Sequence, residues 1–412
     1  MKIGFISIAF PVDLQKYVFG LYKRMGTFIH AMKEMGELDM LFFVHQDITL
    51  NEHFVAETEK RLAKHWDARL RLELCNRAPR RQEQGRWQYY IDPALSITNH
   101  PPYLHTAQRE QISAVRRMLS RKPDILFVHR LASIVPVLLS KEYHPRIYFD
   151  LDDIEHVAFL RSIKQPPFWP GKRLFYLRLP ILKLWERRAI RLSHTTFVCS
   201  EHDRYCLSKD WGSKNIEVIP NAIDVPDIQE LPDKPRLLFL GRMTYLPNTV
   251  AADYLIRKIW PLILSAFPDA KLLIAGPGSE NIASFADCPS GVEFLGFVDN
   301  LEKLYKEVTV VCCPIFSGGG TRIKILEAAA YGKPVVSTTI GAEGIELRDG
   351  EEILLRDGPE SFAEGCIQLL KDRSFAVKIG RAARSVVARK YDRNHVVNRI
   401  RMSLGNSGDC SP

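Results

Sequence analysis

The sequence predicts an α/β protein built from two doubly wound parallel sheets. Short apolar runs alternate with stretches of helical spacing along the whole chain, and this alternation is typical of parallel strands joined by helices. The length of 412 residues allows two domains, each with its own core. An acidic stretch with three prolines, residues 225–235, interrupts the alternation, so we place a linker there.

The part of the chain before this linker holds the elements of the first domain. Its expected strands lie at 2–10, 39–44, 125–128, 146–150, 195–199 and 216–219. Helical spacing marks residues 20–34 and 106–119, while 51–71 has a mixed pattern that we interpret as helical. Residues 77–105 are polar, aromatic and proline-bearing, and we interpret them as an insertion or loop.

The part after the linker repeats the alternation of apolar strands and helical stretches. Its expected strands lie at 237–240, 271–275, 292–294, 309–312, 334–337 and 353–355, with a helix at 249–267 after the first of them. Ligands of doubly wound sheets bind at the carboxyl ends of the strands. Arg242, Gly276, Phe297 and the glycines from Gly318 onward all follow such ends, so we expect the ligand site there.

The composition is that of a globular protein in a reducing compartment. Hydrophobic residues make up 46% and charged residues 25% of the chain, and no run of about 18 apolar residues is present that could cross a membrane. The start, MKIGFISIAF, lacks the long apolar region and cleavage site of a signal peptide and fits a first buried strand. The eight cysteines show no metal-ligand spacing. We therefore expect a cytoplasmic protein with reduced cysteines.

Most of the net charge of +9 lies in residues 161–191, which we name the basic segment. It holds nine Lys and Arg residues but only one acid, Glu186. Five aromatic residues are interleaved with these charges: Phe168, Trp169, Phe175, Tyr176 and Trp185. Such a mixture suits an anionic membrane surface, which predicts a peripheral position on the inner face of the membrane. No nucleic-acid recognition motif accompanies it, so we expect no nucleic-acid partner. A basic helix packed on its own domain is the alternative.

The most informative stretch is residues 313–334, with the sequence CPIFSGGGTRIKILEAAAYGKP. It predicts a strand end, a loop of three glycines and a helix that begins near Thr321. The N–H groups of a first helical turn bind anions, and glycine lets a phosphate approach them. Arg322 and Lys324 add positive charge, and Glu327 could accept hydrogen bonds from ribose hydroxyls. The expected ligand is a diphosphate that carries sugars.

Several ordered motifs between residues 236 and 391 resemble the nucleotide-binding half of the GT-B glycosyltransferases, and family 4 (group 1) in particular. They are LFLGR with Pro247-Asn248, LLIAGPG, VEFLGFVDN and GGGTRIKILEAAAYGKPVVST. The last of them is similar to the GGGTRxKxLEA branch of that family. The first half matches more loosely, through His129 at a strand end and through VIPNAID at 218–224, which resembles the family's hinge.

The resemblance implies a GT-B fold, in which two Rossmann-like domains face each other across a cleft. The domains would be residues 1–225 on the acceptor side and 226–391 for the nucleotide sugar, and a helix in 392–412 would cross back to the first domain before a frayed tail. The implied activity is that of a retaining glycosyltransferase in glycan, polysaccharide or glycolipid biosynthesis. It would move a sugar from a nucleotide diphosphate sugar, UDP- or GDP-linked, to a hydroxyl of a glycan, a glycolipid or another acceptor. No metal ion and no further cofactor would be needed.

The resemblance also assigns roles to single residues. The donor base would contact backbone groups of Phe297 and Val298, and the ribose would contact Glu327. The diphosphate would be held by the side chains of Arg242, Arg322 and Lys324 and by the N–H groups of Gly320 and Thr321. Further donor-binding residues would be Asn248, Gly276, Gly318 and Gly319, together with Gly20 and Arg24, which resemble a first-domain glycine-loop motif. His129 would lie near the transferred sugar, so the catalytic set is His129, Arg242, Arg322 and Lys324.

Two positions depart from the family's pattern. Family members carry two glutamates in the stretch EGFGLPxLEA, and here the second is Glu327 while Gly319 stands at the position of the first. The lysine that follows Arg242 in the family is also missing, with Asn248 near its place. Arg322 and Lys324 would supply the charge of that missing lysine.

Three alternatives stay open. A sugar-nucleotide epimerase or donor hydrolase of the same fold would need no acceptor. A non-catalytic binding protein on a transferase fold would explain Gly319. The D-x-D sequence at Asp150–Asp152 is a metal motif in another transferase fold, but here it follows a strand of the first domain, where capping of the next helix is the favoured interpretation.

Overall fold

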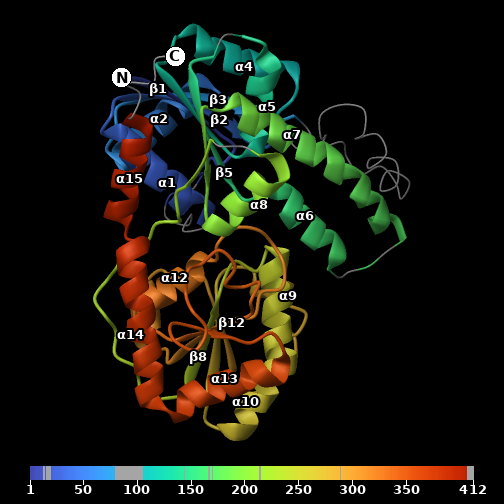
Figure 1. The fold of residues 1–412 in the computed structure, drawn as a ribbon, viewed down its shortest axis with the longest axis vertical. Coiled ribbons are helices and arrows are strands. Elements are labelled where there is room, and N and C mark those ends of the chain that lie inside the picture. The colour runs from blue at the N-terminus through green and yellow to red at the C-terminus, as the bar shows by residue number, and fades with distance from the viewer. Residues whose placement is uncertain are drawn as a thin grey trace. The chain divides into compact units, whose positions relative to one another are not determined.

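The computed structural model describes residues 1–12, 14, 20–78, 105–142, 144–165, 168, 170–212, 215–287 and 289–405. Most of the expected insertion at 77–105 and the end of the expected frayed tail lie outside these residues. The chain divides into two compact units: the first comprises Met1–Pro220 together with the segment from Val396 onward, and the second comprises Asn221–His395 (Figure 1). The chain thus leaves the first unit after Pro220 and returns to it at Val396.

Within the described residues, the first unit holds a seven-stranded parallel sheet of order β3-β2-β1-β4-β5-β6-β7. Its strands are β1 (Lys2–Ser7), β2 (Glu37–Val44), β3 (Leu70–Asn76), β4 (Ile125–His129), β5 (Arg146–Asp152), β6 (Thr195–Val198) and β7 (Ile216–Val218). Its helices are α1 (Gly20–Lys33), α2 (Glu52–Trp66), α4 (Arg109–Ser120), α5 (Leu131–Ser140), α6 (Glu155–Lys164), the 3₁₀ helix η2 (Pro170–Arg178), α7 (Leu179–Leu192), α8 (Glu201–Trp211) and, from Val396 onward, most of α15 (Arg393–Gly405).

Aromatic side chains fill the core of this unit. The rings of Phe5 on β1 and Phe127 on β4 stack with their centroids 5.7 Å apart. The ring centroid of Phe28 of α1 lies 4.7 Å from that of Phe127. All three are buried, as expected for parallel strands that are covered on both faces. The helical interpretation of 51–71 is wrong beyond Trp66: the chain turns at Asp67, whose φ is 49°, and then forms β3, whose alternating sequence suits a sheet edge.

The second unit holds, within the described residues, a six-stranded parallel sheet of order β10-β9-β8-β11-β12-β13. Its strands are β8 (Arg236–Leu240), β9 (Lys271–Ala275), β10 (Val292–Gly296), β11 (Val310–Cys313), β12 (Val335–Ser337) and β13 (Leu354–Leu355). Its helices are α9 (Leu246–Tyr254), the π-helical segment η3 (Leu255–Ile259), α10 (Trp260–Ala266), η4 (Ser279–Asn281), α11 (Leu301–Lys306), α12 (Ile323–Ala330), α13 (Pro359–Lys371) and α14 (Arg373–Lys390).

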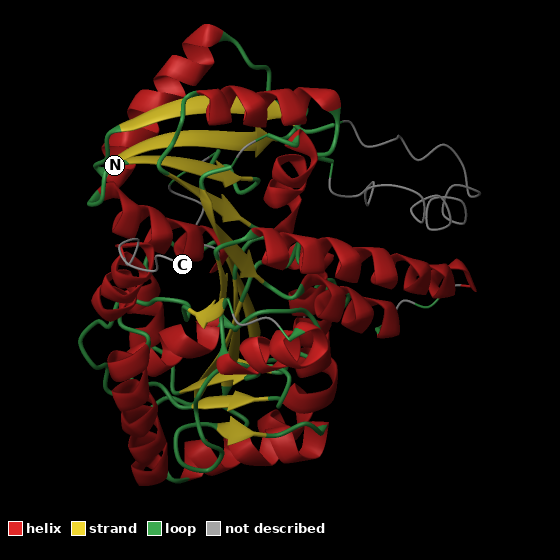
Figure 2. Ribbon diagram, turned by 45° about the horizontal axis from the view of Figure 1, so that its top comes forward, coloured by secondary structure: helices red, strands yellow, loops and turns green. Residues whose placement is uncertain are grey.

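Each unit places its parallel strands between layers of helices (Figure 2). In the second unit, α9 and α10 lie on one side of the sheet, and α12 and α14 pack together on the other (Figure 1). The predicted fold class of two doubly wound sheets is therefore confirmed. None of the described helices combines the length and the apolar character needed to cross a bilayer.

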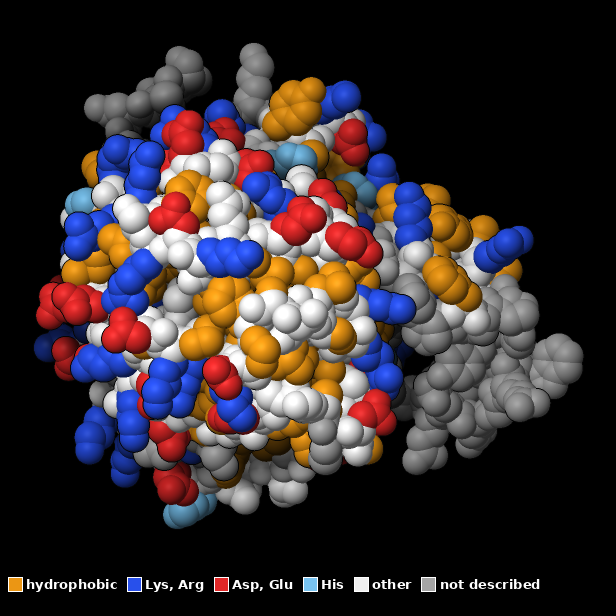
Figure 3. Space-filling view, turned by 90° about the horizontal axis from the view of Figure 1, so that it is seen from below, with side chains coloured by type: hydrophobic (Ala, Val, Ile, Leu, Met, Phe, Trp, Pro, Cys, Tyr) orange, Lys and Arg blue, Asp and Glu red, His pale blue; other side chains and the backbone are white. Residues whose placement is uncertain are grey.

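The described surface seen from one end of the molecule mixes basic, acidic and apolar side chains (Figure 3). Many of the charges form short-range ion pairs, such as Arg257 with Asp253 and Lys306 with Glu302. Exposed pairs of this kind contribute about 0–1 kcal/mol each. The fold therefore depends on its buried sheets and not on these surface pairs.

A close backbone contact joins the carboxyl ends of β8 and β9. Gly241 donates its N–H to the carbonyl of Ala275, and Gly276 donates to the carbonyl of Gly296 at the end of β10. Gly276 has a φ of 127°, and a Cβ atom there would lie 1.9 Å from the carbonyl oxygen of Gly241. Glycine at 276 is therefore required by the fold itself.

We expect Gly276→Ala to destabilise the protein by about 3 kcal/mol or more, because both the positive φ and the contact with Gly241 oppose a side chain. The matched control is Gly26→Ala in α1, where an added Cβ meets no atom within 4 Å and should stabilise the helix by about 0.5–1 kcal/mol. Thermal unfolding of the two variants measures the difference, and equal melting temperatures would contradict this account.

Candidate functional site

The loop between β11 and α12 is shaped by its glycines and by Arg322. Gly318 and Gly320 have φ values of 98° and 65°, which glycine adopts without strain. Arg322 is the residue that precedes the first helical turn, and its guanidinium folds back onto the loop. Its Nη1 donates to the carbonyls of Gly319 and Gly320, and its Nη2 donates to the carbonyl of Ser317 at 3.1 Å. Arg322 therefore organises the glycine loop in addition to carrying positive charge.

Lys324 lies in the first turn of α12, and its ammonium is held by a neutral amide. Its Nζ donates to Oδ1 of Asn248 at 2.9 Å and lies 4.4 Å from the ring centroid of Phe239. Burial lowers the pKa of Lys324 to about 8, and the charge of Arg322 adds to this effect. A buried ammonium is costly unless an anion accompanies it. This arrangement is suited to an anionic ligand.

Asn248 connects Lys324 to the turn that follows β8. Its Nδ2 donates to the carbonyl of Arg242 at 3.0 Å while its Oδ1 accepts from Lys324. The side chain of Arg242 is exposed beside this turn. Thr321, at the end of the glycine loop, accepts a hydrogen bond from Nδ2 of Asn221 at 2.5 Å. The second unit thus gathers the diphosphate-binding residues that the sequence predicts around one helix start.

The remaining residues expected at the donor lie at the same edge of the sheet or on α12. Phe297 and Val298 follow the end of β10; Phe297 is 38% exposed and Val298 packs against the core. Gly276 follows the end of β9, where it contacts Gly241. Glu327 is 8% exposed and lies one turn beyond Arg322 on α12.

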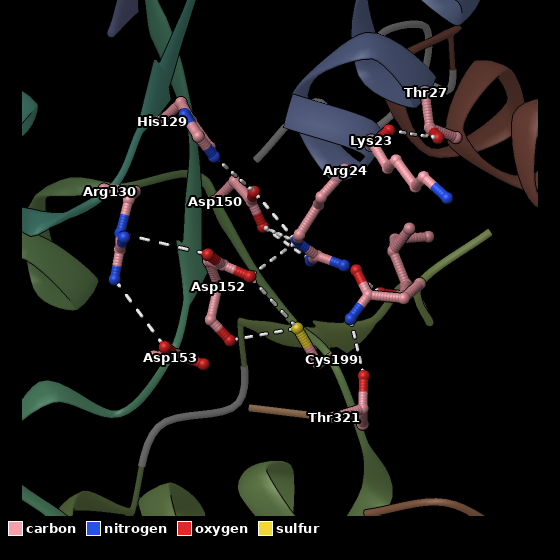
Figure 4. Close-up of polar contacts among 12 residues, drawn as sticks. Lys23, Arg24, Thr27, His129, Arg130, Asp150, Asp152, Asp153, Cys199 and Thr321 are labelled. Carbon is pink, nitrogen blue, oxygen red and sulfur yellow. Dashed lines mark hydrogen bonds and ion pairs between the residues drawn. The ribbon is translucent and has the colours of Figure 1, made fainter. Parts of the chain in front are cut away.

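His129 ends β4 in the first unit and has no exposed surface. Its Nδ1 lies 2.9 Å from Oγ of Ser7. Its Nε2 lies 3.7 Å from Oδ2 of Asp150, as Figure 4 shows. Burial and the charges of Arg130 and Arg24 hold its pKa well below the usual range, so the imidazole is neutral. Because Ser7, His129 and Asp150 are all completely buried, this trio does not have the exposed nucleophile that a hydrolytic triad needs.

Arg24 lies inside the first unit in an ion pair. Its Nη2 lies 2.6 Å from Oδ1 of Asp150, its Nε donates to both oxygens of that carboxylate, and its Nη1 donates to the carbonyl of Ile219 (Figure 4). Asp152 lies 3.6 Å from the same guanidinium. Gly20 is the first residue of α1, one turn before Arg24. The structure thus shows Arg24 in a buried ion pair with Asp150, which the sequence analysis did not predict.

A charged cluster at the ends of β4 and β5 was not foreseen from the sequence. Arg130 and Asp152 have φ values of 73° and 61°, and their side chains approach each other within 3.9 Å. Asp153 lies 3.6 Å from Arg130 (Figure 4). Burial raises the pKa of nearby Glu155 to about 7. The D-L-D-D sequence is the one signal that could have indicated this cluster.

Among the described residues, no group of three or more His, Cys, Asp or Glu side chains is arranged to hold a metal ion.

Two family models match the chain, one in each half. A model described as Glycosyltransferase Family 4 matches residues 52–226, and one described as Glycosyl transferases group 1 matches residues 234–372. Between them they span most of the two units.

Curated relatives match parts of the chain. The phosphatidyl-myo-inositol mannosyltransferase of Mycobacterium leprae is 30% identical over 202 residues, which are 46% of this chain and 53% of the relative. An uncharacterized 44.6 kDa protein in the cps region of Klebsiella pneumoniae is 27% identical over 180 residues, 40% of this chain and 44% of the relative. The chain spans about half the length of the curated relatives it matches.

Solved structures share the fold over almost the whole chain. Anabaena HepE in complex with UDP and glucose has a TM-score of 0.66 at 14% identity, with 98% of this chain and 100% of that chain covered. A variant of S. aureus TarM in complex with fondaparinux, alpha-GlcNAc-glycerol and UDP has a TM-score of 0.68 at 12% identity, with 98% and 100% covered. At such identities the likeness shows the fold alone.

We expect Lys324→Met to stabilise the ligand-free protein at pH 7 by about 1–3 kcal/mol, because it removes a charge that burial disfavours and keeps the side chain's volume. The folded-state pKa of Lys324 lies below its unfolded value, so the penalty is fully present below pH 8 and fades as the pH rises from 8 toward about 10.4. The advantage of the variant should therefore shrink over that window. Thermal unfolding at neutral and alkaline pH measures it, with exposed Lys378→Met in α14 as control. Equal stabilities of Lys324→Met and the parent at pH 7 would contradict this expectation.

Proposed function

The chain belongs to the family 4 (group 1) glycosyltransferases and has their GT-B fold, and from this premise we propose that it moves a sugar from a nucleotide diphosphate sugar to an acceptor hydroxyl. The observation that carries the proposal is the Lys324 ammonium, held by Asn248 beside three glycines at a helix start. A diphosphate would gain charge-assisted hydrogen bonds there, each worth roughly 1.5–3 kcal/mol.

The proposed chemistry is electrostatic. As the bond between the sugar and the diphosphate breaks, negative charge grows on the diphosphate, and Lys324 with Arg322 and Arg242 would stabilise it. No side-chain base is required for this step. Retention of configuration is proposed because it is the stereochemistry that the family resemblance implies. His129, which is neutral and buried, would act by positioning and not as a nucleophile.

We propose that the reaction needs no metal ion. The carboxylates of the D-x-D sequence already have a cationic partner, since Asp150 is paired with Arg24 and Asp152 lies near the same guanidinium. The positive charge that a metal ion would bring to a diphosphate is supplied in the second unit by side chains of α12 and the turn after β8.

The proposed donor is a UDP- or GDP-linked sugar, and the proposed acceptor is a glycan or glycolipid. The HepE and TarM structures contain UDP, and the TarM structure also contains a GlcNAc-glycerol conjugate. The M. leprae relative is named as a mannosyltransferase of a phosphatidyl-inositol lipid. These names support a role in polysaccharide or glycolipid biosynthesis. Gly319 is the one feature that favours a non-catalytic donor-binding protein instead.

We further propose that the basic segment contacts anionic lipid at the inner face of the membrane. Helices α6 and α7 pack together with η2 and extend beyond the sheet of the first unit (Figures 1 and 2). The exposed face of α7 carries Leu184, Arg187, Arg188 and Arg191 at helical spacing. Phe168 is 71% exposed before η2, whereas Trp185 is buried in the core and takes no part. Charge complementarity supports a lipid surface as the partner.

Donor binding is tested by thermal shift with UDP, GDP and ADP and with their sugar esters, each with and without EDTA. A ligand at 100 times its dissociation constant should stabilise the protein by about 2.7 kcal/mol, and we expect one nucleotide class to do so regardless of EDTA. Lys324→Met should abolish both the shift and transfer to any acceptor, while exposed Lys378→Met should change neither. A shift that persists in Lys324→Met would refute the assigned site. Binding without transfer on any acceptor would favour the non-catalytic alternative.

Membrane contact is tested by co-sedimentation with vesicles. Arg187→Glu combined with Arg191→Glu should weaken binding to vesicles that contain phosphatidylglycerol by tenfold or more, because each basic side chain near an anionic surface contributes about 1 kcal/mol. The control, with the same change in net charge, is Lys378→Glu with Arg381→Glu, both exposed on α14. Equal loss in both double variants would show that only net charge matters.

A further inference from the structure

The three glycines of the loop carry no side chain that could recognise a sugar. Gly318, Gly319 and Gly320 offer only backbone groups, and the carbonyls of two of them already accept hydrogen bonds from Arg322. The cations of the site, in turn, are suited to phosphate oxygens and not to neutral hydroxyls. A side-chain contact to a transferred sugar would therefore come from an element that neighbours these glycines.

Tyr245 is a neutral polar side chain that lies against this loop. A Cβ atom on Gly318 would lie 2.7 Å from the Tyr245 hydroxyl oxygen and 3.3 Å from Nη2 of Arg322. The positive φ of Gly318 favours glycine there, and the phenol beside it would have to shift to admit a side chain. Tyr245 is nevertheless 43% exposed, so one part of the ring contacts the loop while another part is accessible to a ligand.

The backbone of Tyr245 is held rigidly. Its N–H donates to the carbonyl of Arg242 at 3.2 Å, and its carbonyl accepts from the N–H groups of Asn248 and Thr249 at 2.9 and 3.2 Å. Pro247 fixes the start of α9 immediately afterward. Asn248, which holds Lys324, lies in the first turn of the helix α9 that Tyr245 precedes.

We infer that Tyr245 contacts the sugar of the bound donor and so determines which sugar is accepted. A phenol offers a hydroxyl that both donates and accepts, and a flat apolar ring on which a sugar can pack. Its position places it next to the anion-binding loop without adding charge there. The diphosphate is bound by the cations and the helix start, and the sugar is bound by Tyr245. This inference rests on the proposed donor-binding function.

The test compares dissociation constants for a nucleoside diphosphate and for its sugar ester, measured by calorimetry on the whole chain. The pair that binds the parent most tightly among UDP with UDP-glucose and GDP with GDP-mannose is used. We expect Tyr245→Phe to weaken the sugar ester about tenfold, the effect of one hydrogen bond, with the free diphosphate unchanged. Tyr245→Ala should weaken the sugar ester further. Tyr205→Phe, at a 65% exposed tyrosine of α8, is the matched control and should leave both constants unchanged.

Each outcome of this comparison either supports or overturns the inference. A changed ratio of the two constants in Tyr245→Phe supports the sugar contact, because a tyrosine that only shapes the loop would weaken both ligands together. Equal weakening of both ligands, or no change in either, overturns the inference while nucleotide binding stands. A parent protein that binds none of the four ligands overturns the donor-binding function and this inference with it.

Discussion

The contact between the backbones of Gly241 and Gly276 is the constraint on which the second unit's site depends. It brings the ends of β8 and β9 so close that no side chain fits between them, and the bond from Gly276 to Gly296 extends the same alignment to β10. The turn after β8 then starts from a fixed point, which sets where Tyr245 and Asn248 lie. Asn248 in turn orients the ammonium of Lys324. The geometry of a charged site thus depends on a close backbone contact that only glycine at position 276 allows.

Arg24 in the first unit and Lys324 in the second are held in opposite ways. In the first unit the charge of Arg24 is paired with a carboxylate. Its Nε and Nη2 donate to Asp150, and its Nη1 donates to the carbonyl of Ile219. Such a pair is expensive to break, because either partner alone would be an uncompensated buried charge. In the second unit Lys324 donates to a neutral amide oxygen, and the nearby charge of Glu327 offsets only part of the cost of burial. The ion pair of Arg24 stabilises the fold. The charge of Lys324 is not fully compensated, so an anionic ligand can compensate it.

The fold could be predicted from the sequence because parallel strands and their helices leave strong local patterns, and the start of α12 could be predicted because its glycines, Arg322 and Lys324 lie close together in the sequence. What escaped prediction depends on contacts between distant residues. The partner of Arg24 lies 126 positions away, and the burial of Trp185 depends on which face of α7 packs against the rest of the unit. Tyr245 was missed because the glycine loop that it contacts lies far along the chain. β3 was missed because its short alternating run follows a helix without a glycine or proline between them.

The chain's exit from the first unit after Pro220 and its return at Val396 have a consequence for folding during synthesis. The second unit is a single continuous segment, so all of its residues are available before α15 has left the ribosome. The segment from Val396 onward joins the first unit only afterwards, although the strands described in that unit were made first. Domains that emerge whole fold as units on the ribosome. The segment from Val396 onward must therefore dock onto a unit whose strands were synthesised before the entire second unit.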